Sequence, residues 1–288
     1  MYETIFLIVL AVLWMGFASV QDWKTRSISN WISFSLIIFA LGFRFFYSLF
    51  SSSLHDMSFG FFYQGLIGLG IFFVLGNLFY YGRVFAGGDA KLMIALGAVL
   101  PFTWNFFVNL EILALFLFLF FLTGGAYGIL WSIFIISRHF SYFKKEFKAR
   151  LAKNKKMLNF FMLFSLIVFA LGFYEIFFVY LGIFSLFAPF LYFGAKAADE
   201  CMVKNIKAKN LEEGDLLYKN LKIKGKTINA GGYGLSEKEI KEIRKRFKIV
   251  KIKEGIPFVP VFLIGFLLLV YFYFWNFLII ENLLGSLF

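Results

Sequence analysis

The chain has almost no cysteine or histidine, which removes most ways of building a metal site. Cys201 is the single cysteine among 288 residues, so an intramolecular disulfide and a cluster of cysteine ligands are both excluded. The two histidines, His55 and His139, lie far apart in the sequence. We therefore expect no bound metal and no cofactor. The sequence also shows no internal repeat and no low-complexity linker.

Charged residues are scarce as well, at 16% of the chain, whereas 61% is hydrophobic and 23% is aromatic. The mean hydropathy is +0.80. A soluble chain of this length cannot bury that much apolar surface, so the composition predicts a membrane protein with several spans. We expect an all-α polytopic protein of about eight transmembrane helices, with a small cytoplasmic α+β domain inserted before the last helix.

The net charge of +12 is concentrated in two blocks. Residues 138–156 hold eight Lys and Arg against one acid, and residues 196–256 hold sixteen against nine. Basic residues gathered in loops are typical of the cytoplasmic side of a membrane protein. No recognition motif accompanies the charge, so we expect no nucleic-acid partner. We expect these blocks to face the headgroups of membrane lipids.

Eight apolar segments are candidate spans. They are residues 4–21, 30–50, 59–81, 90–104, 106–137, 157–173, 175–195 and 257–281. The fourth is short for a full crossing, which needs about 20 residues, and the fifth is long enough to tilt or extend past the bilayer. The sixth and seventh could also form one broken hairpin. We divide the chain into a membrane domain (1–195), a cytoplasmic domain (196–256) and a last helix with its tail (257–288).

The loops indicate an orientation. If every segment crosses once, the loops rich in Lys and Arg all fall on one side, which is then the cytoplasm. The opposite loops are short and mostly acidic, and they include the segment around His55 and Asp56. Asp22, at the end of the first segment, and Asp89, at the start of the fourth, then share the cytoplasmic face. We therefore expect a multi-pass cell-membrane protein with a functional face toward the cytoplasm.

The soluble unit has its own local signals. Residues 221–224 alternate between apolar and charged side chains, as a half-buried strand does. Ser236 precedes a helical pattern by one residue and Glu239 follows three positions later, which predicts a capping box at the start of a helix over about 237–247. Residues 247–253 alternate again and predict a final strand. About sixty residues suffice for a small α+β unit but not for a large active-site domain.

Asp22 and Asp89 are the candidate functional residues. An ionisable side chain at the edge of the hydrocarbon layer is costly, and this makes it a candidate by default. Each could instead be a helix cap, since Asp is favoured at helix starts. Gly87 and Gly88 favour function for Asp89, because they let another backbone approach the carboxylate closely. Lys91 also flanks it, which a simple cap does not require.

Together the two carboxylates suggest a reaction. Two carboxyl groups a few ångströms apart do not both ionise, so one keeps a proton. The ionised group can take a proton from water, which attacks a peptide carbonyl, while the protonated group stabilises the oxyanion. Such a pair titrates as a unit, so the sequence does not say which aspartate is the base.

The residues around both aspartates resemble a known family. The run AGGD at 86–89 is similar to the Gly-x-Gly-Asp signature of intramembrane-type aspartic peptidases, and DWKTRSISN at 22–30 is similar to the matching segment of prepilin peptidases. GIPFVP at 255–260, after a GLSEKEI helix, looks most like the archaeal prepilin and preflagellin peptidases. Ala86 departs from the signature, where the family has Gly. That matters only if the position requires a positive φ.

The resemblance implies roles for particular residues. It makes Asp22 and Asp89 catalytic, and with them we predict a supporting set: Gly87, Gly88, Lys24 and Lys91. The zinc-binding cysteine motif of bacterial bifunctional relatives is absent, so methyltransferase activity is not implied.

The segment GIPFVP has two interpretations. Its prolines could simply open the last helix, where proline is tolerated. Alternatively, Pro257, Phe258 and Pro260 could bind substrate, because prolines leave neighbouring backbone groups free to pair with an extended peptide. Proteolysis needs its substrate locally extended, so this segment is predicted as a substrate-binding platform.

The sequence therefore predicts a metal-independent aspartic endopeptidase of the cell membrane. By its resemblance, it would remove short basic leader peptides from type IV pilin-like or flagellin-like precursors at the cytoplasmic face. One alternative is a small-solute transporter or channel, which the run Thr123-Gly124-Gly125 within a span would fit. Another is an intramembrane protease of transmembrane helices. Whether the substrate is a pilin or a flagellin, and which oligomer forms, is left open.

Overall fold

The computed structural model describes residues 2–51, 59–212, 214–223, 226–230 and 234–285. The predicted outer loop around His55 and Asp56 lies outside these residues. The contacts within the chain define two compact units, Met1–Tyr127 with Ile256–Phe288, and Gly128–Gly255. The first boundary therefore falls within a long helix, whereas the division at 195 and 256 predicted above remains a prediction.

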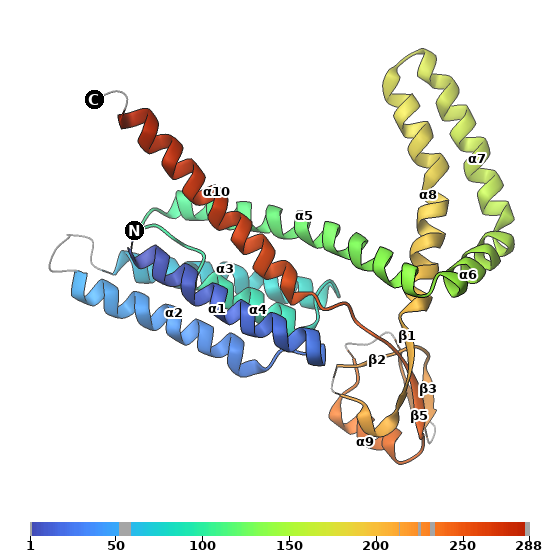
Figure 1. The fold of residues 1–288 in the computed structure, drawn as a ribbon, viewed down its shortest axis with the longest axis horizontal. Helices are drawn as coiled ribbons and strands as arrows, with labels where there is room; N and C mark the ends of the chain where they lie inside the picture. The colour runs from blue at the N-terminus through green and yellow to red at the C-terminus, as the bar shows by residue number, and fades with distance from the viewer. Residues whose placement is uncertain (1, 52–58, 213, 224–225, 231–233, 286–288) are drawn as a thin grey trace. The chain divides into compact units, whose positions relative to one another are not determined.

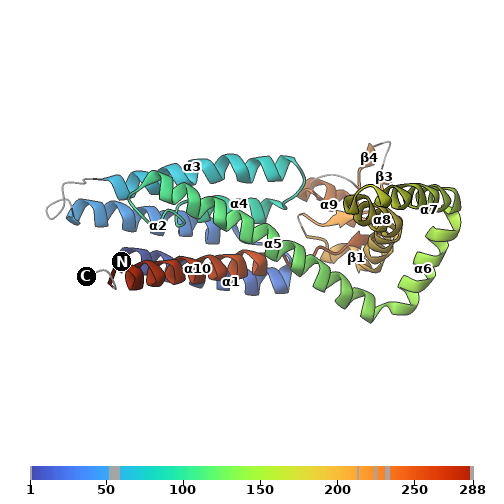
Figure 2. The ribbon, with the colours of Figure 1, turned by 90° about the horizontal axis from the view of Figure 1, so that it is seen from above.

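The first unit is a bundle of helices (Figure 1). Its elements are α1 (Tyr2–Thr25), α2 (Asn30–Ser51), α3 (Gly60–Tyr81), α4 (Gly87–Gly97), the first part of α5 (Phe106–Arg138), and α10 (Val259–Gly285). Helix α10 packs along α1, and α4 packs against α2 and α3, as both views show (Figure 2). The last helix of the chain is thus placed beside the first, which brings residues more than 230 positions apart together.

Six described helices are long and apolar enough to cross a membrane. They are α1, α2, α3, α5, α7 (Lys155–Ala170, continued by η1, Leu171–Phe173) and α8 (Ile176–Cys201). Helix α10 is apolar as far as its side chains are described, to Trp275. Many large apolar side chains on these helices are exposed, as expected of surfaces that face lipid. The chain is therefore a multi-pass membrane protein.

The fourth predicted span is wrong as a spanning helix. Helix α4 has 11 residues, which at 1.5 Å per residue is roughly 16 Å, about half the hydrocarbon thickness. The chain then runs through residues 98–105 without regular helix, and Ala98, Val99, Leu100 and Phe102 are buried there. Hydropathy over 90–104 could not reveal this, because a buried irregular segment is as apolar as a helix.

Arg44 explains how this irregular segment is tolerated. Backbone carbonyls away from water need partners inside the protein. The guanidinium of Arg44, which is fully buried, donates to the carbonyls of Ala98 (2.9 Å), Val99 (3.0 Å) and Phe61 (3.0 Å), and also to that of Pro101. It also lies over the Phe61 ring, 4.2 Å from the centroid. The Arg44 side chain thereby supplies hydrogen-bond donors to the backbone carbonyls that follow α4.

Helices α3 and α4 approach each other closely at two glycines. A Cβ on Gly68 would meet the carbonyl oxygen of Gly97 and lie 2.6 Å from Pro101 Cγ. A Cβ on Gly97 would lie 2.6 Å from Phe72 Cβ. Because backbone cannot move aside as a flexible side chain can, this contact requires glycine on both helices.

Gly68→Ala is therefore expected to lower the free energy of unfolding by about 1–3 kcal/mol, through overpacking against α4. Gly70→Ala is the matched control on the same helix, because a Cβ there meets nothing within 4 Å. That variant should change stability by less than about 1 kcal/mol, in the stabilising direction. Thermal unfolding in mild detergent measures both. Equal stability of the two variants would show that α3 and α4 do not meet at Gly68.

The second unit contains a helical hairpin and a small α+β region (Figure 1). Helix α6 (Phe140–Lys153) precedes α7 and α8. Strands β1 (Val203–Lys207) and β2 (Leu216–Leu217) both pair antiparallel with β5 (Ile249–Lys253), and β3 (Leu221–Ile223) pairs with β4 (Lys226–Ile228). The short helix α9 (Glu237–Arg244) buries Ile240 and Ile243 against this sheet region.

The local predictions for this region are confirmed. Ser236 and Glu239 form the predicted capping box, and the Ser236 N–H donates to Glu239 Oε2 at 2.9 Å. The final strand is present as β5. The predicted helix ends earlier than expected, at Arg244, and Phe247 lies beyond it. Helix α6 was not predicted, although Phe143 and Phe147 have helical spacing and stack at 5.7 Å.

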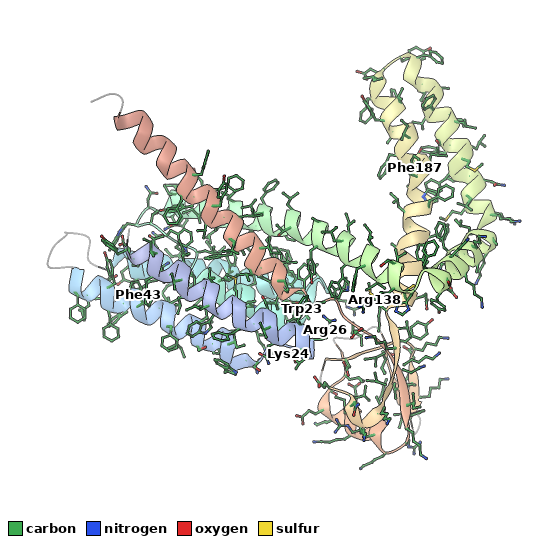
Figure 3. All side chains as sticks on the ribbon, in the orientation of Figure 1. Trp23, Lys24, Arg26, Phe43, Arg138 and Phe187 are labelled. Carbon is green, nitrogen blue, oxygen red and sulfur yellow. The ribbon has the colours of Figure 1, made fainter. Side chains whose placement is uncertain are left out.

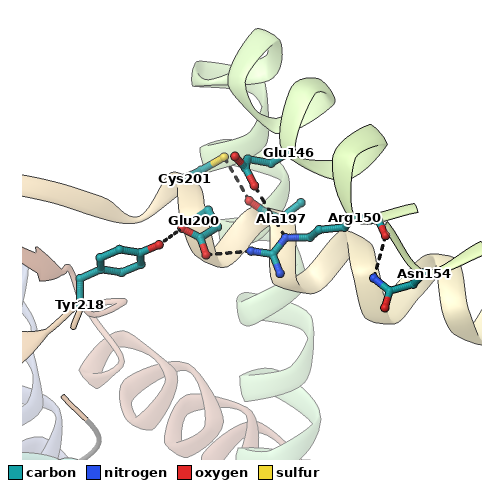
Figure 4. A network of polar contacts seen from close by, with 7 residues as sticks. All are labelled: Glu146, Arg150, Asn154, Ala197, Glu200, Cys201 and Tyr218. Carbon is teal, nitrogen blue, oxygen red and sulfur yellow. Dashed lines mark hydrogen bonds and ion pairs between the residues drawn. The ribbon is translucent and has the colours of Figure 1, made fainter. Parts of the chain in front are cut away.

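A polar network fastens the end of α8 within this unit (Figure 4). Arg150 of α6 pairs with Glu200 at 2.8 Å, and the Tyr218 hydroxyl donates to the other oxygen of that carboxylate at 2.8 Å. This bond raises the pKa of the Tyr218 phenol, because the neighbouring carboxylate disfavours the phenolate. Glu200 thus joins a helix, the hairpin and the strand region through one carboxylate.

Candidate active site

Asp22 lies in the last turn of α1 and is buried, at 6% exposure. Its Oδ2 accepts the backbone N–H of Val259 at 3.0 Å, and the N–H of Phe258 also bonds to the carboxylate. Val259 is the first residue of α10, where the backbone N–H groups have no partner within the helix. The Asp22 side chain, at the end of α1, therefore accepts hydrogen bonds from backbone N–H groups at the start of α10.

Asp89 occupies the third position of α4 and is half-buried. The helix cap is Ala86, and the Asp89 carboxylate accepts the Ala86 N–H, which is the return half of a capping box. Asp89 is therefore not the cap residue considered above. The negative charge stands at the positive end of the α4 dipole, which favours it there.

The two aspartates are brought near each other. The charge of Asp22 acts on Asp89, so the carboxyl groups lie within electrostatic range. Two contacts between the motifs hold this arrangement. Lys91 Nζ donates to Asn30 Oδ1 at 2.6 Å, and a Cβ on Gly88 would lie 3.2 Å from the Ile28 side chain. The segments 22–30 and 86–91 therefore pack as one site.

The predicted supporting residues lie in different surroundings. A Cβ on Gly88 would make a tight contact with the Ile28 side chain, whereas a Cβ on Gly87 would make an ordinary 3.7 Å contact with Tyr80. Lys91 reaches Asn30, as described above. Lys24 is exposed at the end of α1, beside the labelled Trp23 and Arg26 (Figure 3). It lines an apolar groove between α1 and α2, and the helical spacing puts that groove on the face of α1 opposite Asp22.

The departure at Ala86 has no backbone cost. Its φ is −70° and its ψ is 161°, an extended conformation that any residue adopts. The left-handed residue of this loop is Arg83, with φ 59°. A glycine is therefore not needed at position 86, and the substitution leaves the loop geometry intact.

Phe258 packs tightly within the bundle. Its ring lies 5.8 Å from that of Phe120 and 6.4 Å from that of Phe85. Pro257 is buried, and Pro260 is part-buried in the first turn of α10. The N–H of Val259 between the prolines is bonded to Asp22 and is therefore occupied. Substrate binding by Pro257, Phe258 and Pro260 remains a prediction.

Within the glycine run of α5, Gly124 has a packing explanation, whereas a Cβ on Gly125 would meet nothing within 4 Å. A Cβ on Gly124 would lie 3.2 Å from Phe258 Cζ, so this glycine admits the aromatic ring beside Asp22. Thr123 Oγ1 donates to the carbonyls of Leu119 and Phe120 in its own helix. This run, which favoured a transporter above, thus brings α5 close to α10 next to the aspartates.

Sequence reasoning missed two residues around Asp22. Tyr127 of α5 interacts electrostatically with both Asp22 and Arg26, and Trp23 hydrogen-bonds its side chain. Arg26 was not predicted as a residue of the site, although its charge acts on the Asp22 carboxylate. The sequence could have pointed to Tyr127, because it places a lone phenol at the end of a glycine-rich run within a span.

The fold and this site define a class: a multi-pass membrane protein with two acidic motifs packed together at the ends of α1 and α4. Residues 9–129, which include both motifs, match the type IV leader peptidase family. Two curated relatives are similar over 93 residues. A preflagellin peptidase of Methanococcus maripaludis is 30% identical, and one of Methanocaldococcus jannaschii is 32% identical. The region with both aspartates is therefore similar to the type IV leader peptidase family.

These similarities cover a part of each protein. The aligned stretch is 32% of this chain, and it spans 38% of the length of the first relative and 37% of the second. No solved structure matches the chain.

Proposed function

We propose that the protein is an aspartic endopeptidase that removes short basic leader peptides from type IV pilin-like or flagellin-like precursors. The observation that carries the proposal is the packing of the Asp22 motif against the Asp89 motif, through Ile28 on Gly88 and Asn30 on Lys91. The match of residues 9–129 to the type IV leader peptidase family and the names of both relatives support it. The site would face the cytoplasm, as the distribution of basic loops indicates.

The proposed reaction uses only the two carboxyl groups and water. One aspartate is ionised and the other carries a proton, because like charges in a site shielded from water do not both persist. The ionised carboxylate takes a proton from water as the oxygen attacks the peptide carbonyl. The protonated carboxyl gives its proton to the carbonyl oxygen, and a tetrahedral diol forms. The first group then gives its proton to the leaving nitrogen, and the second recovers a proton from the diol, so that the C–N bond breaks and both groups are restored.

The location suits a substrate cut beside an apolar helix. Asp22 lies in the last turn of the 24-residue helix α1, and Asp89 lies in the first turn of α4. A precursor held in the bilayer by its apolar helix would present the peptide bond before that helix at the same depth. The leader would then remain in the aqueous phase.

The test is a cleavage assay in membranes. Vesicles containing the protein are mixed with a precursor that carries a short basic leader before an apolar helix, and the product is mapped by mass spectrometry. The expected result is one cut at the leader boundary. The assay is run with a pilin-like and with a flagellin-like precursor. If neither precursor is cleaved, the proposal is contradicted.

Pro257→Ala tests the substrate-binding part separately. The variant restores a backbone N–H next to Phe258 and loosens the entry to α10, while Asp22 keeps its bond to Val259. We expect leader cleavage to fall by about tenfold, mainly through a higher KM, with thermal unfolding close to that of the wild type. An unchanged KM would remove Pro257 from the substrate platform.

A further inference from the structure

Asp22 and Asp89 differ first in the number of backbone N–H groups that donate to their carboxylates. Asp22 receives two backbone N–H groups, from Phe258 and Val259, at the start of the 27-residue helix α10. The partial positive charge of a helix start favours both carboxylates, because Asp89 stands at the start of α4, so this charge does not distinguish them. Asp89 receives one backbone N–H, from Ala86. Hydrogen bonds to the charged form therefore favour ionisation of Asp22 over Asp89.

The second difference is a cation. Arg26 follows α1 with φ 55°, a left-handed conformation that residues with a side chain rarely adopt. Its N–H bonds to the Asp22 carbonyl at 2.9 Å, which closes the helix end in this conformation. The chain turns back at this point, and a terminal nitrogen of the guanidinium is buried. The Arg26 charge acts on the carboxylate of Asp22.

Asp89 has no comparable cation among the charges that act on it in the described structure. The charge that acts on Asp89 is that of Asp22, which repels a second negative charge. Lys91, two residues along α4, bonds to Asn30 instead. An ionised Asp22 therefore makes it harder for Asp89 to lose its proton.

Resting on the proposed function, we infer that Asp22 is the ionised general base and Asp89 the protonated acid, with Arg26 as the positioning residue that keeps Asp22 charged. In the first step Asp22 takes a proton from water and Asp89 gives its own to the carbonyl oxygen. In the second step Asp22 passes that proton to the leaving nitrogen, and Asp89 recovers one from the diol as the C–N bond breaks. Protons and charge balance over the cycle.

The described groups that face Asp22 come from each element packed around it. They are Arg26 directly after α1, Asp89 on α4 and Tyr127 on α5, while α10 contributes backbone N–H groups. Arg26 is the cation of this set. Its removal should therefore change the pH at which Asp22 becomes ionised.

The test is the pH dependence of kcat/KM for leader cleavage, measured in the full-length protein. Without the Arg26 cation, Asp22 takes up a proton more easily. Arg26→Gln should therefore move the acidic limb of the profile to higher pH by about 0.5–1 unit. Arg26→Lys should restore most of the wild-type profile. Arg246→Gln, the same change at an exposed position of the second unit, should leave the profile unchanged. A lower rate with an unmoved acidic limb would overturn the role of Arg26.

Residual activities give a second measurement that does not depend on Arg26. An Asn at position 89 can still donate a hydrogen bond to the carbonyl oxygen, as a protonated acid does. An Asn at position 22 cannot take a proton from water. We expect Asp89→Asn to retain at least about ten times the activity of Asp22→Asn. The reverse order would overturn the assignment while leaving the peptidase intact, whereas full activity of both variants would overturn the proposed function itself.

Discussion

Replacing Arg44 with Met is expected to lower the free energy of unfolding by about 3–5 kcal/mol, comparable to breaking a buried ion pair. The variant leaves the carbonyls of Phe61, Ala98, Val99 and Pro101 without their shared donor. Each buried carbonyl without a partner costs about 1–3 kcal/mol, and relief from burying the Arg44 charge offsets part of the sum. Thermal unfolding in mild detergent measures the loss.

Two further variants make this prediction specific. Arg138→Met removes an exposed arginine whose guanidinium carbon lies 4.6 Å from the centroid of the Phe134 ring. This variant should lower the free energy of unfolding by less than about 1 kcal/mol. Arg44→Lys offers one ammonium in place of a planar fork and should fall between wild type and Met. An Arg44→Met protein as stable as the Arg138→Met protein would show that the segment after α4 is paired in another way.

Replacing Asp22 or Asp89 with Asn is expected to lower the rate of leader cleavage by about 10²–10⁴-fold, because each group moves a proton in the reaction. Asn has nearly the same shape as Asp. Its carbonyl oxygen can still accept the N–H of Val259 at position 22 or of Ala86 at position 89. The variants should therefore fold, and their thermal unfolding should lie near that of the wild type.

Asp199→Asn is the control for these variants. Asp199 pairs with Lys253 at 3.0 Å in the second unit, where its side chain is 54% exposed, so the change should leave cleavage unaffected. Loss of activity in this control would point to a general effect of removing a carboxylate. Wild-type activity in both site variants would make the two aspartates helix-end residues and nothing more.

Features encoded in adjacent residues could be predicted from the sequence. The capping box of Ser236 and Glu239 and the alternation in β5 depend on neighbours within a few positions. Asp22 and Asp89 were found because carboxylates at the ends of apolar segments are rare and costly. Span counting placed both at ends on the same predicted side, but it could not predict that the two carboxyl groups lie near each other.

Features that depend on distant partners could not be predicted. Helix α4 gives way to an irregular segment whose carbonyls bind Arg44, which lies 54 to 57 positions away. The spans were counted by hydropathy, which does not register a buried arginine as a partner for the backbone. Likewise, Asp22 bonds to Val259 across 237 residues, and no local pattern indicates that α10 begins against α1.

The position of Asp89 shows the limit of local patterns most clearly. Asp after two glycines favours a helix cap in the sequence, yet the helix starts two residues earlier, at Gly87, with Ala86 as its cap. Tertiary contacts hold the first turns of α4, with Gly88 against Ile28 and Lys91 bonded to Asn30. The same contacts hold the Asp89 motif against the Asp22 motif.

The most direct test of the central claim is whether Asp22 and Asp89 act as one catalytic unit. Single-turnover cleavage of a leader-bearing precursor would be measured for wild type, Asp22→Asn, Asp89→Asn and the double variant. Groups that act together are strongly non-additive, so the double variant should be no slower than Asp22→Asn alone. Losses that multiply in the double variant, as they do for independent sites, would contradict a shared mechanism.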